Sequence, residues 1–126
     1  MSAHRLLVID DEPEFSALVQ TVGERLGYAV SVASRAEDFK ASYTAAPPQV
    51  IVLDIVMPEV DGIELTRWLA ENGCTARVIL ITGRNPDYAA AAKALAEASS
   101  AMLVRILTKP LKLAELRAAL APADPT

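Results

Sequence analysis

The segment at residues 50–54 constrains the fold more than any other part of the sequence. Residues 50–53 are Val-Ile-Val-Leu, and Asp54 follows them directly. A short apolar run without alternation is typical of a strand that is buried on both faces of a sheet. Ligands of open α/β sheets bind at the carboxyl edge of the strands, where this aspartate would lie. Taken alone, Asp54 is better explained as a helix cap or a loop residue.

Two further apolar runs also end in polar side chains. Residues 5–9 are followed by Asp10 and Asp11, and residues 77–81 are followed by Thr82. The carboxyl ends of parallel strands meet at one edge of a sheet, so these carboxylates and this hydroxyl are expected near Asp54. Together they indicate a functional site.

Strand and helix patterns alternate five times along the chain. The expected strands are residues 5–9, 29–33, 50–54, 77–81 and 102–107. Short connections favour right-handed βαβ units and therefore a parallel sheet with helices on both faces. The first, third and fourth strands read as interior and the other two as edges. This predicts a doubly wound, flavodoxin-like (βα)5 sandwich of order 2-1-3-4-5, with the acids at its switch point.

The helices are predicted from the spacing of apolar residues. The buried faces are expected to contain Phe15, Leu18, Val19, Val22 and Leu26 in the first helix, Ala36, Phe39 and Tyr43 in the second, Leu65, Trp68 and Leu69 in the third, and Leu113, Leu116 and Leu120 in the fifth. Ser34 is the expected N-cap of the second helix. The helix after Pro86 is rich in alanine, which favours helix but buries little area.

Length and composition predict one domain with its own core. The chain has 126 residues, of which 52% are hydrophobic, and we expect the domain at residues 1–120 and a tail or the start of a linker at 121–126. The single cysteine, Cys74, cannot form an internal disulfide and is expected to be an incidental thiol. A net charge of −4 argues against direct nucleic-acid binding. The sequence has neither a signal peptide pattern nor an apolar run of about 18 residues, so we expect a cytoplasmic protein without membrane contact.

The clustered acids repel one another, so either a cation binds among them or their pKa values are raised. Two carboxylates about 4 Å apart repel each other by roughly 4 kcal/mol at an effective dielectric of 20. A hard divalent ion, Mg²⁺, is the preferred partner because it needs only one or two direct carboxylates and keeps several waters. His4 and Cys74 are each the sole residue of their type, so the chain lacks a zinc ligand set.

A carboxylate beside a magnesium ion, a lysine and a hydroxyl suits phosphoryl transfer. Asp54 would attack phosphorus, Lys109 and Mg²⁺ would neutralise the phosphoryl oxygens, and Thr82 would donate a hydrogen bond to one of them. Lys109 alone is more often a solvated surface residue, and Thr82 alone is more often a helix cap. Their shared position at strand ends favours the functional interpretation over these two simpler ones.

The ordered motifs resemble those of bacterial two-component response-regulator receiver domains of the chemotaxis-regulator type. The resemblance runs from about Arg5 to Leu120, and its motifs are Asp10-Asp11, Asp54 with Met57-Pro58, Asp61-Gly62, Thr82 and Lys109-Pro110. Each motif is weak alone, whereas the ordered set is specific.

The resemblance implies a phosphoacceptor that a sensor histidine kinase or a phosphotransfer protein phosphorylates on Asp54. It implies that Asp11 and Asp54 bind Mg²⁺ together with the main-chain carbonyl of Val56, while Asp10 assists indirectly. The protein would then be a signalling domain, which catalyses only its own phosphorylation and dephosphorylation.

The resemblance also implies roles beyond the metal. Thr82 and Lys109 would read the phosphoryl group, and the peptide bond before Pro110 would be cis. An output domain or partner protein would bind the face between the fourth and fifth helices, and phosphorylation could drive dimer formation. Ile106 stands where such domains carry an aromatic switch residue, so we expect switching to use the alanine-rich helix instead.

Alternative functions remain open at this point. The main one is a receiver-like interaction module that does not use phosphate. A haloacid-dehalogenase-like phosphatase would need an aspartate at position 56, which is valine, and three acids from Asp10 onward would repel the phosphate of FMN in a flavodoxin. The output could be a stand-alone action or a fused effector; residues 107–113 faintly resemble receivers that precede cyclic-di-GMP phosphodiesterase domains.

Overall fold

The computed structural model describes residues 4–57, 60–83, 86–98 and 102–121. In chain order the elements are β1 (His4–Ile9), α1 (Pro13–Arg25), β2 (Tyr28–Ala33), α2 (Ala36–Ala45), β3 (Val50–Asp54), β4 (Val56–Met57), β5 (Val60–Asp61), α3 (Gly62–Glu71), β6 (Arg77–Thr82), α4 (Pro86–Ala98), β7 (Leu103–Thr108) and α5 (Leu113–Leu120).

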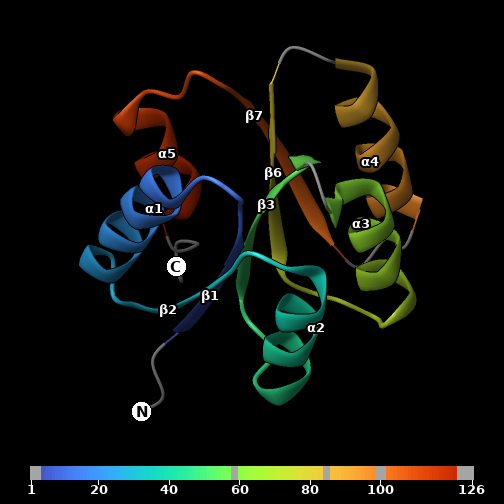
Figure 1. The fold of residues 1–126 in the computed structure, drawn as a ribbon, viewed down its shortest axis with the longest axis horizontal. Coiled ribbons are helices and arrows are strands. Elements are labelled where there is room, and N and C mark those ends of the chain that lie inside the picture. Colours follow the sequence, from blue (N-terminus) through green and yellow to red (C-terminus); the bar gives the residue numbers. More distant parts are fainter. Residues whose placement is uncertain (1–3, 58–59, 84–85, 99–101, 122–126) are drawn as a thin grey trace, which may run out of the picture.

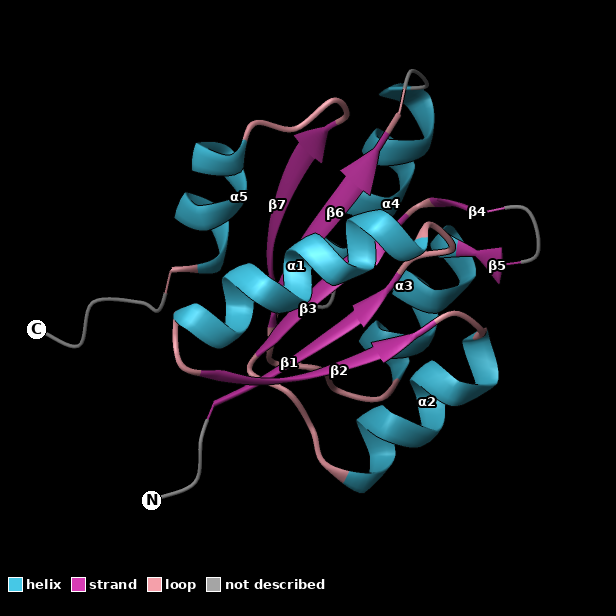
Figure 2. Ribbon diagram, turned by 60° about the vertical axis from the view of Figure 1, so that its left-hand side comes forward, coloured by secondary structure: helices cyan, strands magenta, loops and turns pink. Residues whose placement is uncertain are grey.

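The main sheet is parallel and has the predicted topology. Its five strands lie in the order β2-β1-β3-β6-β7, which is 2-1-3-4-5 when the strands of this sheet are numbered by themselves (Figure 2). β1 and β3 are direct neighbours, paired from Leu6 with Val50 to Ile9 with Leu53. The predicted fold class, a flavodoxin-like α/β sandwich, is therefore confirmed.

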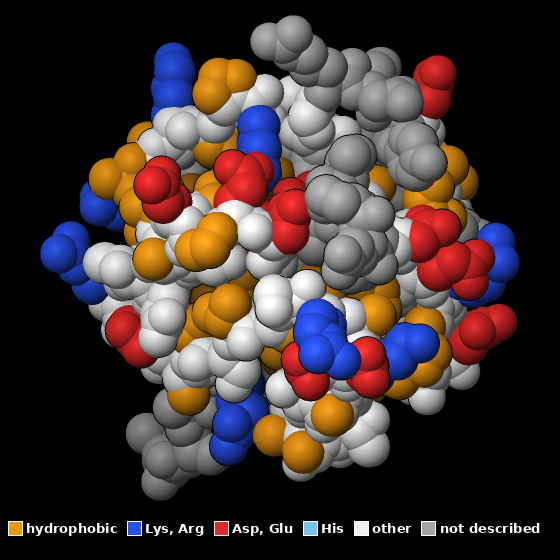
Figure 3. Space-filling model, in the orientation of Figure 1, with side chains coloured by type: hydrophobic (Ala, Val, Ile, Leu, Met, Phe, Trp, Pro, Cys, Tyr) orange, Lys and Arg blue, Asp and Glu red, His pale blue; other side chains and the backbone are white. Residues whose placement is uncertain are grey.

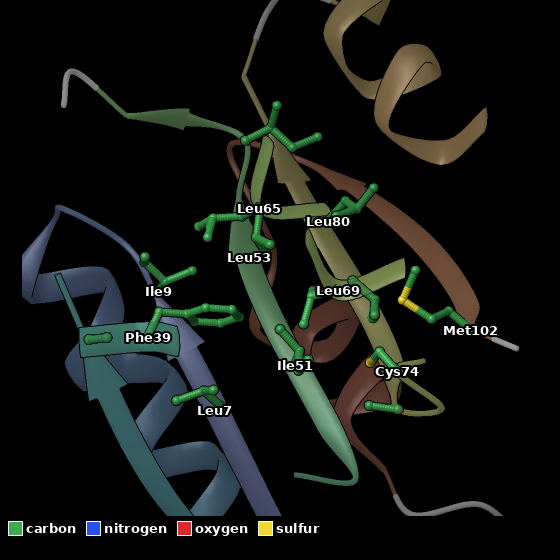
Figure 4. Packing of buried hydrophobic residues seen from close by; sticks show 14 residues of the cluster. Leu7, Ile9, Phe39, Ile51, Leu53, Leu65, Leu69, Cys74, Leu80 and Met102 are labelled. Atoms are coloured by element: carbon green, nitrogen blue, oxygen red, sulfur yellow. The ribbon is translucent and has the colours of Figure 1, made fainter. Parts of the chain in front are cut away.

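Helices cover both faces of the sheet (Figure 1). α1 and α5 lie on one side, and α2, α3 and α4 lie on the other. Each side has its own buried cluster. The cluster beneath α2 and α3 includes Phe39, Leu53, Leu69 and Leu80 (Figure 4). β3 contributes to both clusters, and all five of its residues are buried, as its unbroken apolar run predicts.

A tight connection fixes the chain just after Asp54. The predicted loop at residues 57–62 is in part a short antiparallel pair, β4 with β5, and Pro58 lies outside the described residues. The carboxylate of Asp61 caps α3 by accepting hydrogen bonds from the backbone N–H groups of Ile63 at 2.9 Å and Glu64 at 3.3 Å. At Gly62 a Cβ atom would lie 2.5 Å from Cα of Ile55, so only glycine lets α3 begin this close to β3.

Three details of the predicted helices are wrong. Leu18 is 41% exposed, because it lies on the side of α1 that lines an open hollow rather than on the side facing the sheet. Leu113 is 47% exposed, because it is the first residue of α5, and the helix packs through its later turns at Leu116 and Leu120. Ser34 does not cap α2; the N-cap is Arg35, and its side chain makes no capping hydrogen bond.

The alanine-rich helix α4 forms where it is predicted. Its described side chains, at positions 87, 90, 91, 93, 94, 97 and 98, are all exposed. Among the described residues, no helix is long and apolar enough to span a membrane.

Candidate functional site

The ends of four parallel strands bring the predicted site residues to one edge of the sheet. Asp10 follows β1, Asp54 ends β3, Thr82 ends β6 and Lys109 follows β7. The backbone ties these ends together: the N–H of Ile55 donates to the carbonyl of Ile81 at 2.9 Å, and the N–H of Lys109 donates to the carbonyl of Thr82 at 2.8 Å. The positions of the functional side chains are thus set by the pairing of the strands.

Among the described residues, four carboxylates converge at this edge. Asp10, Asp11, Glu12 and Asp54 each offer an oxygen, and these oxygens all lie within 4.8 Å of one another. Asp10 and Asp54 are buried, at 2% and 3% exposure, whereas Asp11 and Glu12 are exposed. In the upper middle of Figure 3, acidic side chains lie beside a basic one. The prediction of converging carboxylates agrees with this arrangement, and Glu12 is an additional member that sequence reasoning did not assign to the site.

The carboxyl group of Asp10 is held in a buried, negatively charged environment. Burial raises the pKa of Asp10 to about 6, and the charge of Asp54 adds to this rise, although the backbone N–H of Glu12 and the charge of Lys109 oppose it. The N–H of Glu12 donates to Oδ1 of Asp10 at 2.7 Å. Oδ2 is buried and has no hydrogen-bond partner among the described residues. A buried carboxylate oxygen without a donor is what a cation or its bound water would satisfy.

Lys109 supplies the positive charge of the site. Its Nζ lies 2.5 Å from Oε1 of Glu12, 3.2 Å from Oδ2 of Asp54 and 3.8 Å from Oδ2 of Asp10. It also lies 4.8 Å from the centre of the Phe15 ring. Burial on its own lowers the pKa of Lys109, but the hydrogen bonds and charges of these three carboxylates outweigh it and leave the pKa raised. Lys109 is therefore positively charged at neutral pH.

The remaining predicted residues take the following places. Thr82 is buried, at 3% exposure, and pairs with Thr108 across the sheet. Val56 lies in β4 opposite Asp61, one residue beyond Ile55, and its side chain is outside the described part of the structure. The peptide bond between Lys109 and Pro110 is cis. Ile106 pairs with Leu80 and packs against the cluster beneath α2 and α3.

The donor set fits a hard divalent cation. Magnesium binds oxygen ligands and uses one or two carboxylates, and the carboxylates of Asp10, Asp11 and Asp54 lie together with an unsatisfied oxygen among them. Lys109 already balances part of this negative charge. A single nucleophilic carboxylate, a lysine and a hydroxyl around such an ion form a set of groups suited to phosphoryl transfer.

Comparisons with known proteins place the chain in a family. The family described as "Response regulator receiver domain" matches residues 6–121. The alkaline phosphatase synthesis transcriptional regulatory protein PhoP of Bacillus subtilis is 32% identical over 84 residues, which cover 67% of this chain and 35% of PhoP. The transcriptional regulatory protein AruR of Pseudomonas aeruginosa is 38% identical over 88 residues, covering 66% of this chain and 36% of AruR. The chain thus spans about a third of the length of these relatives.

Solved structures agree. A response regulator from Colwellia psychrerythraea superposes with a TM-score of 0.77 at 30% identity and covers 94% of each chain. The signal receiver domain of a LuxO repressor protein from Vibrio parahaemolyticus gives a TM-score of 0.80 at 20% identity, covering 94% of this chain and 88% of that one, and supports the fold. With the family match over most of the chain, the conclusion is direct: this chain belongs to the response-regulator receiver domains of two-component systems.

Proposed function

We propose that this receiver domain is a phosphoacceptor that takes a phosphoryl group on Asp54 from a sensor histidine kinase or a phosphotransfer protein. The observation that carries the proposal is the position of the Lys109 ammonium, 3.2 Å from Oδ2 of Asp54, within a cluster of carboxylates at one strand edge. Asp54 is 3% exposed and closes a fully buried strand, so the nucleophile is held in one place. A fixed nucleophile with its counter-charge in place is the arrangement that a transfer reaction needs.

The reaction follows from these groups. A carboxylate oxygen of Asp54 attacks the phosphorus of a phosphohistidine, the P–N bond breaks with its electron pair left on the imidazole, and an acyl phosphate forms on Asp54. Lys109 offsets the charge of the phosphoryl oxygens, and the hydroxyl of Thr82 donates a hydrogen bond to one of them. Water later attacks the acyl phosphate and releases inorganic phosphate, which restores the carboxylate. The domain would therefore act as a signalling switch that transforms only itself.

The chemistry implies a magnesium ion. Asp11, Asp54 and the main-chain carbonyl of Val56 would hold Mg²⁺, with Asp10 acting indirectly, and the ion would neutralise charge on the transferring group. The unsatisfied Oδ2 of Asp10 and the gathered carboxylates support this assignment.

The rest of the proposal concerns the signal. The receiver domain would comprise residues 1–120, with residues 121–126 as a tail or the start of a linker, and would act in the cytoplasm. Its output domain or partner protein would bind the face formed by α4, β7 and α5, and phosphorylation could also promote a dimer through that face. The exposed edge of β7, where Leu103 is 71% exposed, and the exposed side chains of α4 support this choice of face. With Ile106 packed against the cluster beneath α2 and α3, the change would involve α4 rather than a swinging ring.

A direct test uses acetyl phosphate as a small phosphodonor. With Mg²⁺, the wild-type domain should gain the mass of one phosphoryl group, whereas Asp54→Asn or removal of Mg²⁺ by EDTA should abolish the gain. Asp38→Asn is a matched control because Asp38 is an exposed acid in the first turn of α2 and is not a member of the carboxylate cluster. Labelling that survives in Asp54→Asn would disprove the assignment of the nucleophile. A wild-type domain that takes no label under any condition would favour the phosphate-independent interaction module.

A further inference from the structure

The ammonium of Lys109 is held from its outer side by two residues at the start of α1. The shortest of its contacts is with Oε1 of Glu12, at 2.5 Å, and the ring of Phe15 lies 4.8 Å from it. The proposed transfer reaction uses neither of these side chains. Both lie at the start of α1, which is far from β7 in the sequence: Glu12 and Lys109 are 97 positions apart.

We propose that Glu12 competes with the phosphoryl group for Lys109 and so slows the phosphorylation of Asp54. The inference rests on the proposed function and deepens it. Glu12 acts through Lys109 and is therefore a positioning residue rather than a catalytic one. The competition has a simple origin: an ammonium has three N–H groups, and three carboxylates, those of Glu12, Asp54 and Asp10, already lie within 4 Å of Nζ.

The distances show which contact would have to give way. Lys109 donates to Glu12 and to Asp54 in this structure. A phosphoryl group on Asp54 adds charged oxygens that need the same ammonium. The side chain of Asp54 is 5% exposed and cannot move away, whereas that of Glu12 is 61% exposed. Lys109 would therefore have to give up Glu12.

The surroundings leave room for this exchange. An open hollow of about 400 Å³ lies next to the Glu12–Lys109 pair, and its lining includes Glu12, Phe15, Leu18, Gly83, Lys109 and Leu111. The side chain of Glu12 can turn into this space without disturbing the core. The ring of Phe15 keeps a favourable contact with the ammonium after Glu12 has left, because a cation is attracted to the face of an aromatic ring.

Three variants test the proposal by the rate of labelling with acetyl phosphate and Mg²⁺ at fixed ionic strength. Glu12→Gln keeps the shape but removes the charge, and Glu12→Asp keeps the charge but shortens the reach to Lys109. Both should be labelled about two- to fivefold faster than wild type, which is the scale of one partly exposed ion pair. Glu14→Gln is the matched control, because Glu14 is an exposed acid in the first turn of the same helix, and its rate should stay at the wild-type value.

Each outcome decides the matter. If Glu12→Gln is labelled no faster than Glu14→Gln, the competition does not exist. If Glu12→Gln is faster but Glu12→Asp behaves as wild type, the effect is repulsion between a negative charge and the anionic donor, and the proposal is overturned. If the wild-type domain takes no label at all, the proposed function itself has failed, which is a separate result. Acceleration in both Glu12 variants, without a change in Glu14→Gln, supports the proposal.

Discussion

The strands β3 and β7 both pair in parallel with β6, yet they hold their functional residues in different ways. Every residue of β3 is buried, and Asp54 at its end is 3% exposed. β7 is an edge strand in which exposed and half-buried residues alternate until Leu107, and the side chain of Lys109 that follows it is 24% exposed. The central strand therefore supplies a fixed carboxylate, while the edge strand is followed by a cation with several partners. This difference allows one group of the site to exchange contacts while the other stays in place.

The largest expected effect concerns the stability that each strand provides. Ile51→Ala in β3 removes a fully buried side chain and should lower the free energy of unfolding by about 2–5 kcal/mol. Leu103→Ala in β7 truncates a side chain that is 71% exposed and should change it by less than about 0.5 kcal/mol. Urea unfolding of both variants measures the two values. Similar losses in the two variants would show that β7 is not the weakly packed edge described here.

An intermediate effect is expected at Asp10, beside the buried carboxylate of Asp54. Its pKa is raised to about 6 in the folded domain, from an ordinary value of 3.8, so the folded domain binds a proton more tightly than the unfolded chain. Stability without Mg²⁺ should therefore fall as the pH rises from about 4 to about 6. Asp10→Asn removes this loss and should stabilise the magnesium-free domain at pH 7 by about 1–3 kcal/mol.

Thermal unfolding at pH 4 and pH 7 measures the effect of Asp10→Asn. The stabilisation should be small at pH 4, where Asp10 is protonated in the folded wild-type domain. Addition of Mg²⁺ should stabilise wild type more than Asp10→Asn. A variant that is less stable than wild type at pH 7 without Mg²⁺ would contradict the raised pKa.

A smaller effect than at Ile51 or Asp10 is expected at Ile106 in the edge strand. Ile106 is half-buried and packs against the cluster beneath α2 and α3, so Ile106→Val should cost no more than about 1 kcal/mol. Labelling of Asp54 by acetyl phosphate should keep its wild-type rate, because the side chain serves packing. Urea unfolding and the labelling assay measure the two quantities. A changed labelling rate would indicate that Ile106 is coupled to the site despite lacking a ring.

The parts of the molecule set by local pattern were predictable from the sequence. Unbroken apolar runs mark β1, β3 and β6 as interior strands, and the alternation of strands with helices leaves few topologies. Because strand order fixes which ends are neighbours, the approach of Asp10 to Asp54 followed from the same pattern. The structure explains the Asp61-Gly62 motif: Asp61 caps α3, and Gly62 allows α3 to begin close to Ile55.

Contacts between long side chains from distant segments were not predictable from the sequence. The contact of Glu12 with Lys109 depends on two long side chains from opposite ends of the chain, and spacing carries no information about it. The only sequence signal for this contact was that Glu12 is a third consecutive acid, directly after Asp10 and Asp11. Leu18 fits the spacing of a buried face, but it lies at the margin of that face, where a hollow replaces the sheet.

Cys74 gives the domain a built-in chemical reporter. The thiol is 1% exposed and lies in the cluster that joins α2 and α3 to the sheet (Figure 4). An alkylating reagent can reach it only when the packing of α2 and α3 on the sheet opens locally. The rate of modification therefore measures how often this side of the sheet opens. Since Cys74 is the single cysteine of the chain, this readout needs no engineered probe and no background correction for a second thiol.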